Sequence, residues 1–168
     1  MGFSLPASMG AAFARKDLPI ISISGDGGIQ MNIQEIATCV EYKVPVKIFI
    51  LNNGYLGMVR QWQELFWRKR YSQVAMFSPD FVKLAEAYGC PGYRAIETSE
   101  VEDVIKKALA VKNGPVIVEF KVVQEDNVYP MIPAGQTWNE MLDVPNQELS
   151  EVEGEEIETE ELITLTKG

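Results

Sequence analysis

Three segments of the chain consist almost entirely of apolar residues, many of them β-branched: residues 19–24, 45–51 and 115–123. Nearly unbroken apolar character, without strict alternation with polar residues, is typical of strands that are buried on both faces of a parallel sheet. We therefore expect three strands of this kind.

Apolar positions with helical spacing lie between these segments. Ser78, Pro79 and Asp80 predict the start of a helix, with Ser78 as its N-cap and Gly89 at its end. The pair at positions 99 and 102, a serine and a glutamate, predicts a capping box for a second helix. A third stripe falls between the first two strands. We interpret all three stripes as core packing; they comprise Phe81, Leu84, Ala85 and Tyr88, then Val101, Val104, Ile105, Ala108 and Leu109, and finally Ile33, Ile36, Ala37 and Val40.

Alternation of strands and helices predicts an α/β fold, an open parallel sheet flanked by helices. Charge then divides the 168 residues into two parts. The net charge is −9, but nine acidic residues and one lysine lie from Asp143 onward, which leaves −1 for residues 1–142. We expect one domain over residues 1–145 and an acidic, flexible tail over residues 146–168. The near-neutral domain offers no basic face for nucleic acid.

Histidine is absent, which excludes Ser-His and Cys-His nucleophile pairs and histidine metal sites. The two cysteines, Cys39 and Cys90, form no metal or redox motif, and unclustered thiols are typical of a reducing cytoplasm. No apolar run approaches the roughly 20 residues needed to span a membrane. The composition therefore indicates a cytoplasmic protein without a membrane partner.

Two loop motifs follow two of the predicted strands. Gly25-Asp26-Gly27-Gly28 comes directly after the first strand, and Asn52-Asn53-Gly54 directly after the second. Either motif alone is typical of a turn. If the strands are neighbours, however, both motifs lie at the carboxyl edge of the sheet, where open α/β sheets bind ligands.

The residue types in these motifs suit a magnesium diphosphate. Mg²⁺ prefers oxygen ligands, a few from protein and the rest from phosphate and water. Asp26 offers a carboxylate, Asn53 an amide oxygen, and the main chain near Tyr55 a carbonyl. Gly25, Gly27 and Gly28 allow the backbone and the next helix start to approach phosphates closely. We predict a metal site formed by Asp26, Asn53 and Tyr55.

The spacing of Gly25-Asp26-Gly27 and Asn52-Asn53 resembles the signature of thiamine diphosphate enzymes. Flanking segments narrow the resemblance to the C-terminal domain of the acetolactate (acetohydroxyacid) synthase large subunit. These segments cover residues 1 to about 142 and comprise Met1–Ala11, Gln30–Ile36, Gly57–Gln63, Glu64–Phe66 with Arg70–Ser72, and Tyr129–Pro133. The resemblance implies a Rossmann-like, thiamine diphosphate-binding fold.

The resemblance also implies roles for residues outside the two motifs. Met1 would lie beside the aminopyrimidine, and Leu56 and Gly57 would join the cofactor-binding set. Met58 would form an apolar wall near the thiazolium ring and, with Trp62, would line the substrate channel. Without the resemblance, Met58 and Trp62 form an apolar i, i+4 pair of the kind that packs a core.

By the same resemblance, the parent enzyme condenses pyruvate, after decarboxylation, with a second 2-ketoacid in branched-chain amino acid biosynthesis. It implies thiamine diphosphate and Mg²⁺ here, FAD bound outside this chain, and a homo-oligomer. The family's catalytic glutamate lies on an upstream pyrimidine-binding domain or subunit, so we expect no catalytic residue in this chain. The chain is then a fragment or one subunit of a split enzyme. Gly28 departs from the serine or alanine that is commoner in the family.

Two alternatives remain open at this point. The chain is the length of the short subunit of a two-subunit thiamine diphosphate-dependent 2-ketoacid decarboxylase, although Gly57–Gln63 argues against that interpretation. A non-catalytic cofactor- or partner-binding module, with an acidic tail that recruits a partner, is the second alternative.

Overall fold

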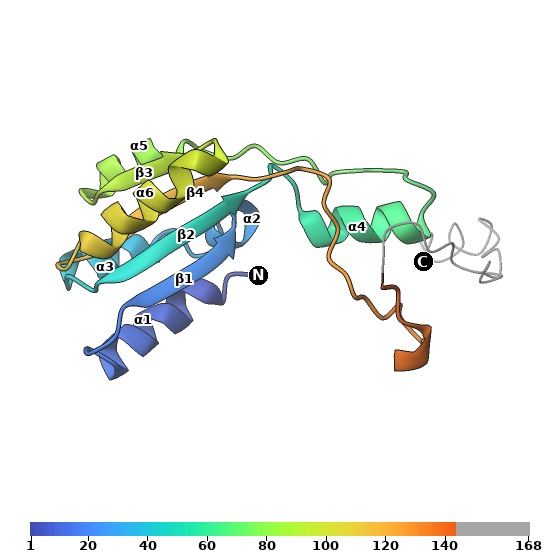
Figure 1. The fold of residues 1–168 in the computed structure, drawn as a ribbon, viewed down its shortest axis with the longest axis horizontal. Helices are drawn as coiled ribbons and strands as arrows, with labels where there is room; N and C mark the ends of the chain where they lie inside the picture. The colour runs from blue at the N-terminus through green and yellow to red at the C-terminus, as the bar shows by residue number, and fades with distance from the viewer. Residues whose placement is uncertain (144–168) are drawn as a thin grey trace, which may run out of the picture. The chain divides into compact units, whose positions relative to one another are not determined.

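The computed structural model describes residues 1–143, so the predicted tail over residues 146–168 lies outside the described residues. The chain divides into two compact units, Met1–Val128 and a second that begins at Tyr129. The first unit contains α1 (Ser4–Ala14), β1 (Ile20–Gly25), α2 (Asp26–Ile29), α3 (Glu35–Glu41), β2 (Val46–Asn52), α4 (Gly57–Phe66), α5 (Phe81–Tyr88), β3 (Gly92–Ala95), α6 (Thr98–Ala110) and β4 (Val116–Lys121) (Figure 1).

The sheet is parallel throughout and has the strand order β1-β2-β4-β3. The predicted α/β architecture and the pairing of the first two strands are confirmed. Gly25 is in register with Leu51, and Asn52 with Lys121, so the ends of β1, β2 and β4 lie at one edge. In Figure 1, α2 and α4 both lie beyond the arrowheads of β1 and β2. This edge is where the two motifs emerge.

Each face of the sheet has its own apolar core. On one face α1, α2, α3 and α5 pack against β2 and β4, and this core contains both cysteines; on the other, α6 packs against β3 and β4. Burial raises the pKa of each thiol, Cys39 and Cys90, to about 11. Their interpretation as small buried side chains is therefore confirmed.

The prediction that all three strands are buried on both faces is wrong for β1. The prediction holds for β2 and β4, whose residues are buried almost without interruption. In β1 the side chains of Ile21 and Ile23 are exposed, because β1 is an edge strand and no helix of the described unit packs on them.

Both predicted helix caps are displaced. Asp80, not Ser78, caps α5, because its carboxylate accepts hydrogen bonds from the backbone N–H groups of Val82 and Lys83. The end at Gly89 is confirmed, with φ +78°. The capping box of α6 is formed by residues 97 and 100, both glutamates, not by residues 99 and 102, because α6 begins at Thr98.

The second unit is described over residues 129–143. Met131 and Leu142 pair through two backbone hydrogen bonds, and both side chains are buried. A 3-10 turn, Trp138–Glu140, lies between them and has a capping box formed by Thr137 and Glu140. In the part of the chain that the structure describes, no helix is long and apolar enough to cross a membrane.

Candidate functional site

A groove of about 1230 Å³ lies at the carboxyl edge of the sheet in the first unit. Its walls come from the start of α1, the ends of β1, β2 and β4, and the loops that follow them. The groove brings together all ten residues that the sequence predicted to bind the cofactor: Met1, Gly25, Asp26, Gly27, Gly28, Asn53, Tyr55, Leu56, Gly57 and Met58.

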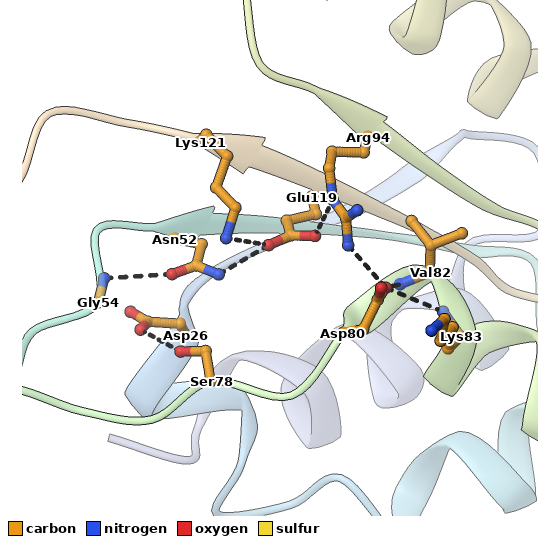
Figure 2. A network of polar contacts seen from close by, with 10 residues as sticks. All are labelled: Asp26, Asn52, Gly54, Ser78, Asp80, Val82, Lys83, Arg94, Glu119 and Lys121. Carbon is orange, nitrogen blue, oxygen red and sulfur yellow. Dashed lines mark hydrogen bonds and ion pairs between the residues drawn. The ribbon is translucent and has the colours of Figure 1, made fainter.

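Asp26 is the first residue of α2, and only 1% of its surface is exposed. The expectation that it lies on a loop is therefore wrong, because the chain enters α2 directly from β1. Ser78 donates a hydrogen bond from its hydroxyl to Asp26 Oδ2 at 2.7 Å (Figure 2). No hydrogen bond to Oδ1 is formed within residues 1–143. Ser78 thus fixes one carboxylate oxygen, while the other has no hydrogen-bond donor among the described residues.

The two asparagines of the second motif face different surroundings. Asn53 lines the groove, and its side-chain oxygen accepts a hydrogen bond from the backbone N–H of Tyr55 at 3.1 Å. Asn52 is buried; its Oδ1 accepts from the backbone N–H of Gly54 at 3.1 Å. Gly54 has φ +71°, a conformation that favours glycine. Hydrogen bonds within the loop therefore hold its tight turn.

A later segment braces this loop from outside. Leu56 donates its backbone N–H to the carbonyl of Val74, and Met76 donates to the carbonyl of Gly54. Residues 74–76 thus pair with residues 54–56 like a short antiparallel strand. Ser78 lies two residues further on, so the same segment contacts both motifs.

At three glycines a side chain would fit only if neighbouring side chains moved by a few tenths of an ångström. A Cβ at Gly27 would come within 3.0 Å of Leu56 Cδ2 and of Met76 Sδ. A Cβ at Gly57 would lie 3.3 Å from the side-chain nitrogen of Asn53. These glycines allow the two motifs to pack closely.

Gly28 is the third of these glycines and the position at which the chain departs from the family. A Cβ there would lie 3.0 Å from Ser24 Oγ. An alanine or serine at this position would therefore require the Ser24 hydroxyl to move by a few tenths of an ångström.

Behind Asn52 lies a charged network that sequence reasoning missed (Figure 2). Glu119 is 1% exposed; it accepts hydrogen bonds from Asn52 Nδ2 at 2.7 Å, Lys121 Nζ at 2.7 Å and Arg94 Nε at 2.6 Å. Burial alone would raise the pKa of Glu119, but these hydrogen bonds outweigh it and lower the pKa. Arg94 also pairs with Asp80, the cap of α5, at 2.6 Å. The network therefore joins β2, β3, β4 and α5.

Only Trp62, among the predicted site residues, does not line the groove. It packs against Phe66 on the same helix, with ring centroids 5.2 Å apart. Met58 and Met1 do line the groove, and half or more of each side chain is exposed. The substrate-channel role of Met58 and Trp62 stays a prediction.

The oxygens at this edge could hold a hard divalent cation together with phosphate. Within residues 1–143 no group of three or more His, Cys, Asp or Glu residues could hold a metal. A cation here would need the mixed set that was predicted: one carboxylate, one amide oxygen and one main-chain carbonyl. Mg²⁺ accepts such a set when a diphosphate completes its coordination. The residues present fit that group, and the metal site stays a prediction.

An open α/β sheet with a glycine-rich, aspartate-bearing groove at its carboxyl edge defines a cofactor-binding domain. Residues 1–120 match the family described as thiamine pyrophosphate enzyme, C-terminal TPP binding domain. The chain belongs to this family. The resemblance to thiamine diphosphate enzymes and the predicted fold class are thereby confirmed.

The chain is similar to acetolactate synthases in particular. It is 48% identical over 146 residues to acetolactate synthase of Mycobacterium leprae, covering 84% of this chain and 23% of that protein. It is 45% identical over 143 residues to the acetolactate synthase large subunit of Haemophilus influenzae, covering 84% and 25%. The chain thus spans about a quarter of the length of these relatives, and their names favour the predicted family over both alternatives.

A solved structure supports the fold. The thiamine diphosphate-dependent 4-hydroxybenzoylformate decarboxylase of Rhodococcus jostii RHA1 superposes with a TM-score of 0.69 at 33% identity. The match covers 75% of this chain and 24% of that one. The shared architecture therefore extends across three quarters of the chain.

Proposed function

We propose that the groove binds the diphosphate end of thiamine diphosphate through a magnesium ion. Asp26 Oδ1, Asn53 Oδ1 and the main-chain oxygen of Tyr55 would hold the ion. The first turn of α2 has no side-chain cap, so its backbone N–H groups would face the phosphates. The single observation that carries this proposal is that one groove contains both the Asp26 carboxylate and the Asn53 loop.

The chain's own residues would bind and orient the cofactor, not move protons. The groove contains no histidine, and Asp26 would serve as a metal ligand. Leu56, Met58 and Met1 would form an apolar wall that keeps water from the middle of the cofactor. When bound, the cofactor supplies the carbanion chemistry of 2-ketoacid decarboxylation and ligation.

We propose further that the parent activity is acetolactate synthase, in which decarboxylated pyruvate is joined to a second 2-ketoacid. The support is the similarity to enzymes of that name over 84% of the chain. Met58 and Trp62 would face that substrate. FAD, where the full enzyme uses it, would bind outside these 168 residues.

A partner domain completes the proposed site. The groove is open, and Met1 and Phe3 on its wall are 72% and 79% exposed. A complete cofactor site buries most of its ligand. The pyrimidine end would therefore be covered by an upstream domain or a neighbouring subunit, which would also supply the catalytic carboxylic acid.

The test is acetolactate formation from pyruvate at saturating Mg²⁺ and thiamine diphosphate. A polypeptide of these 168 residues alone is expected to show no turnover. Addition of the upstream domains of a relative, such as the Haemophilus influenzae enzyme, is expected to restore activity. Turnover by the 168 residues alone would contradict the proposal that the site needs a second domain.

A further inference from the structure

The buried carboxylate of Glu119 is linked to the proposed metal-binding loop through one side chain. Glu119 lies on β4, and its Oε1 accepts a hydrogen bond from Asn52 Nδ2 on the neighbouring strand β2. The other end of that amide, Asn52 Oδ1, accepts from the backbone N–H of Gly54. Figure 2 shows this chain of contacts running from β4 to the loop.

The charge on Glu119 fixes which way the Asn52 amide points. A carboxylate can only accept hydrogen bonds, so it requires the –NH₂ end of the amide to face it. The oxygen end must then face Gly54. Arg94 and Lys121 keep the carboxylate ionised by pairing with it at 2.6 and 2.7 Å. An uncharged glutamine in its place could donate as well as accept, and the amide would lose this constraint.

Sheet stability alone does not account for a carboxylate at this position. Replacing a buried ion pair with well-packed apolar residues is often neutral or stabilising. Beyond its ion pairs, Glu119 adds the orientation of Asn52.

We propose that Glu119 is a positioning residue for cofactor binding, which acts through Asn52 to fix the Gly54 peptide between Asn53 and Tyr55. The inference rests on the proposed function of the loop. In that role Glu119 touches neither cofactor nor metal. It sets the conformation in which the Asn53 and Tyr55 oxygens converge.

The variants Glu119→Gln and Asn52→Ala of the 168-residue chain test this inference. Exchange of the Gly54 amide hydrogen, measured by NMR without ligand and relative to Ile48 in the core of β2, should accelerate at least about tenfold in both. Calorimetric affinity for thiamine diphosphate with Mg²⁺ should fall about 10- to 100-fold, as when an outer partner of a metal site is removed. The double variant should bind the cofactor with the same affinity as Asn52→Ala, because both substitutions break the same chain of hydrogen bonds.

Val118→Ala is the matched control, because it leaves a cavity on the same strand without touching Asn52. It should lower the melting temperature yet leave relative Gly54 exchange and cofactor affinity unchanged. If Glu119→Gln also left relative Gly54 exchange and cofactor affinity unchanged, the inference would be overturned. A wild-type chain that binds no cofactor would count against the proposed function instead, and Gly54 exchange would still decide the role of Glu119.

Discussion

Single residues outside the recognised motifs determine how the motif residues are held. Ser78 is the clearest case, because its hydroxyl makes the only hydrogen bond to the Asp26 carboxylate within residues 1–143. That bond occupies Oδ2 and orients Oδ1, the oxygen that we propose as a metal ligand. A serine that reads as a helix cap in the sequence is therefore part of the site.

Ser78→Ala should weaken Mg²⁺-dependent cofactor binding about tenfold, because the carboxylate loses its outer partner. Stability should fall by about 1.5–3 kcal/mol, the usual contribution of a hydrogen bond to a charged group. Calorimetry and urea unfolding measure the two effects. Ser72→Ala is the control, because that exposed hydroxyl makes no hydrogen bond in the described residues. Unchanged affinity in Ser78→Ala would remove Ser78 from the site.

At this scale the sequence predicts the motif residues but not their supports. Asp26 and Asn53 are found because each directly follows a strand and the residue type suits magnesium. Ser78 and Glu119 carry no such signal, since their contacts span 52 and 67 positions of the sequence. Only the order of the strands brings these residues beside the motifs.

Among the elements, the long apolar strands carry the strongest local signal in the sequence. β2 and β4 are strongly apolar, and the sequence predicts both. β3 is only four residues, Gly92–Ala95, with a charged arginine in it, and α1 is built largely of small and apolar residues that are not confined to its buried face. Both are held by contacts with neighbouring strands, α1 with β1 and β3 with β4. Tertiary contacts of this kind leave little local signal.

The network that joins β2, β3, β4 and α5 should make the fold sensitive to acid. The pKa of Glu119 in the folded chain lies below its ordinary value of 4.5. Its contribution to stability is therefore complete above that ordinary pKa and is lost as pH falls through the folded pKa. Urea unfolding of the wild type should show stability declining below about pH 4.5.

Glu119→Gln provides the comparison for this prediction, because glutamine does not titrate. The difference in stability between wild type and variant should shrink as the pH is lowered from 7 to 3. Carboxylates outside the network, such as Glu140, titrate in both proteins and cancel in the difference. A constant difference across this range would show that the charge of Glu119 does not stabilise the fold.

On the scale of the whole molecule, the first unit contains a groove that we propose as one wall of a cofactor site. The carboxyl edge gathers all ten predicted cofactor-binding residues, as the topology of two adjacent βα units led us to expect. The far side of the groove, which includes Ile96, Lys121 and Val123, was not predicted, because it depends on where β3 and β4 end. The predicted tail lies outside the described residues.

The central claim is that this groove binds thiamine diphosphate through a magnesium ion on Asp26. Titration calorimetry of the 168-residue chain measures it most directly, with wild type, Asp26→Asn and the control Asp17→Asn, which changes an exposed carboxylate paired with Arg15. Asparagine at position 26 keeps an oxygen for Ser78, so the melting temperature should stay close to that of the wild type.

Wild type and Asp17→Asn should bind the cofactor in a saturable way that disappears when EDTA removes Mg²⁺. Loss of a residue that only supports a metal ligand weakens binding roughly 10- to 100-fold. Asp26→Asn changes the ligand itself, so its affinity for the cofactor should fall further than that. Equal affinities of wild type and Asp26→Asn, or binding that is indifferent to Mg²⁺, would contradict the account.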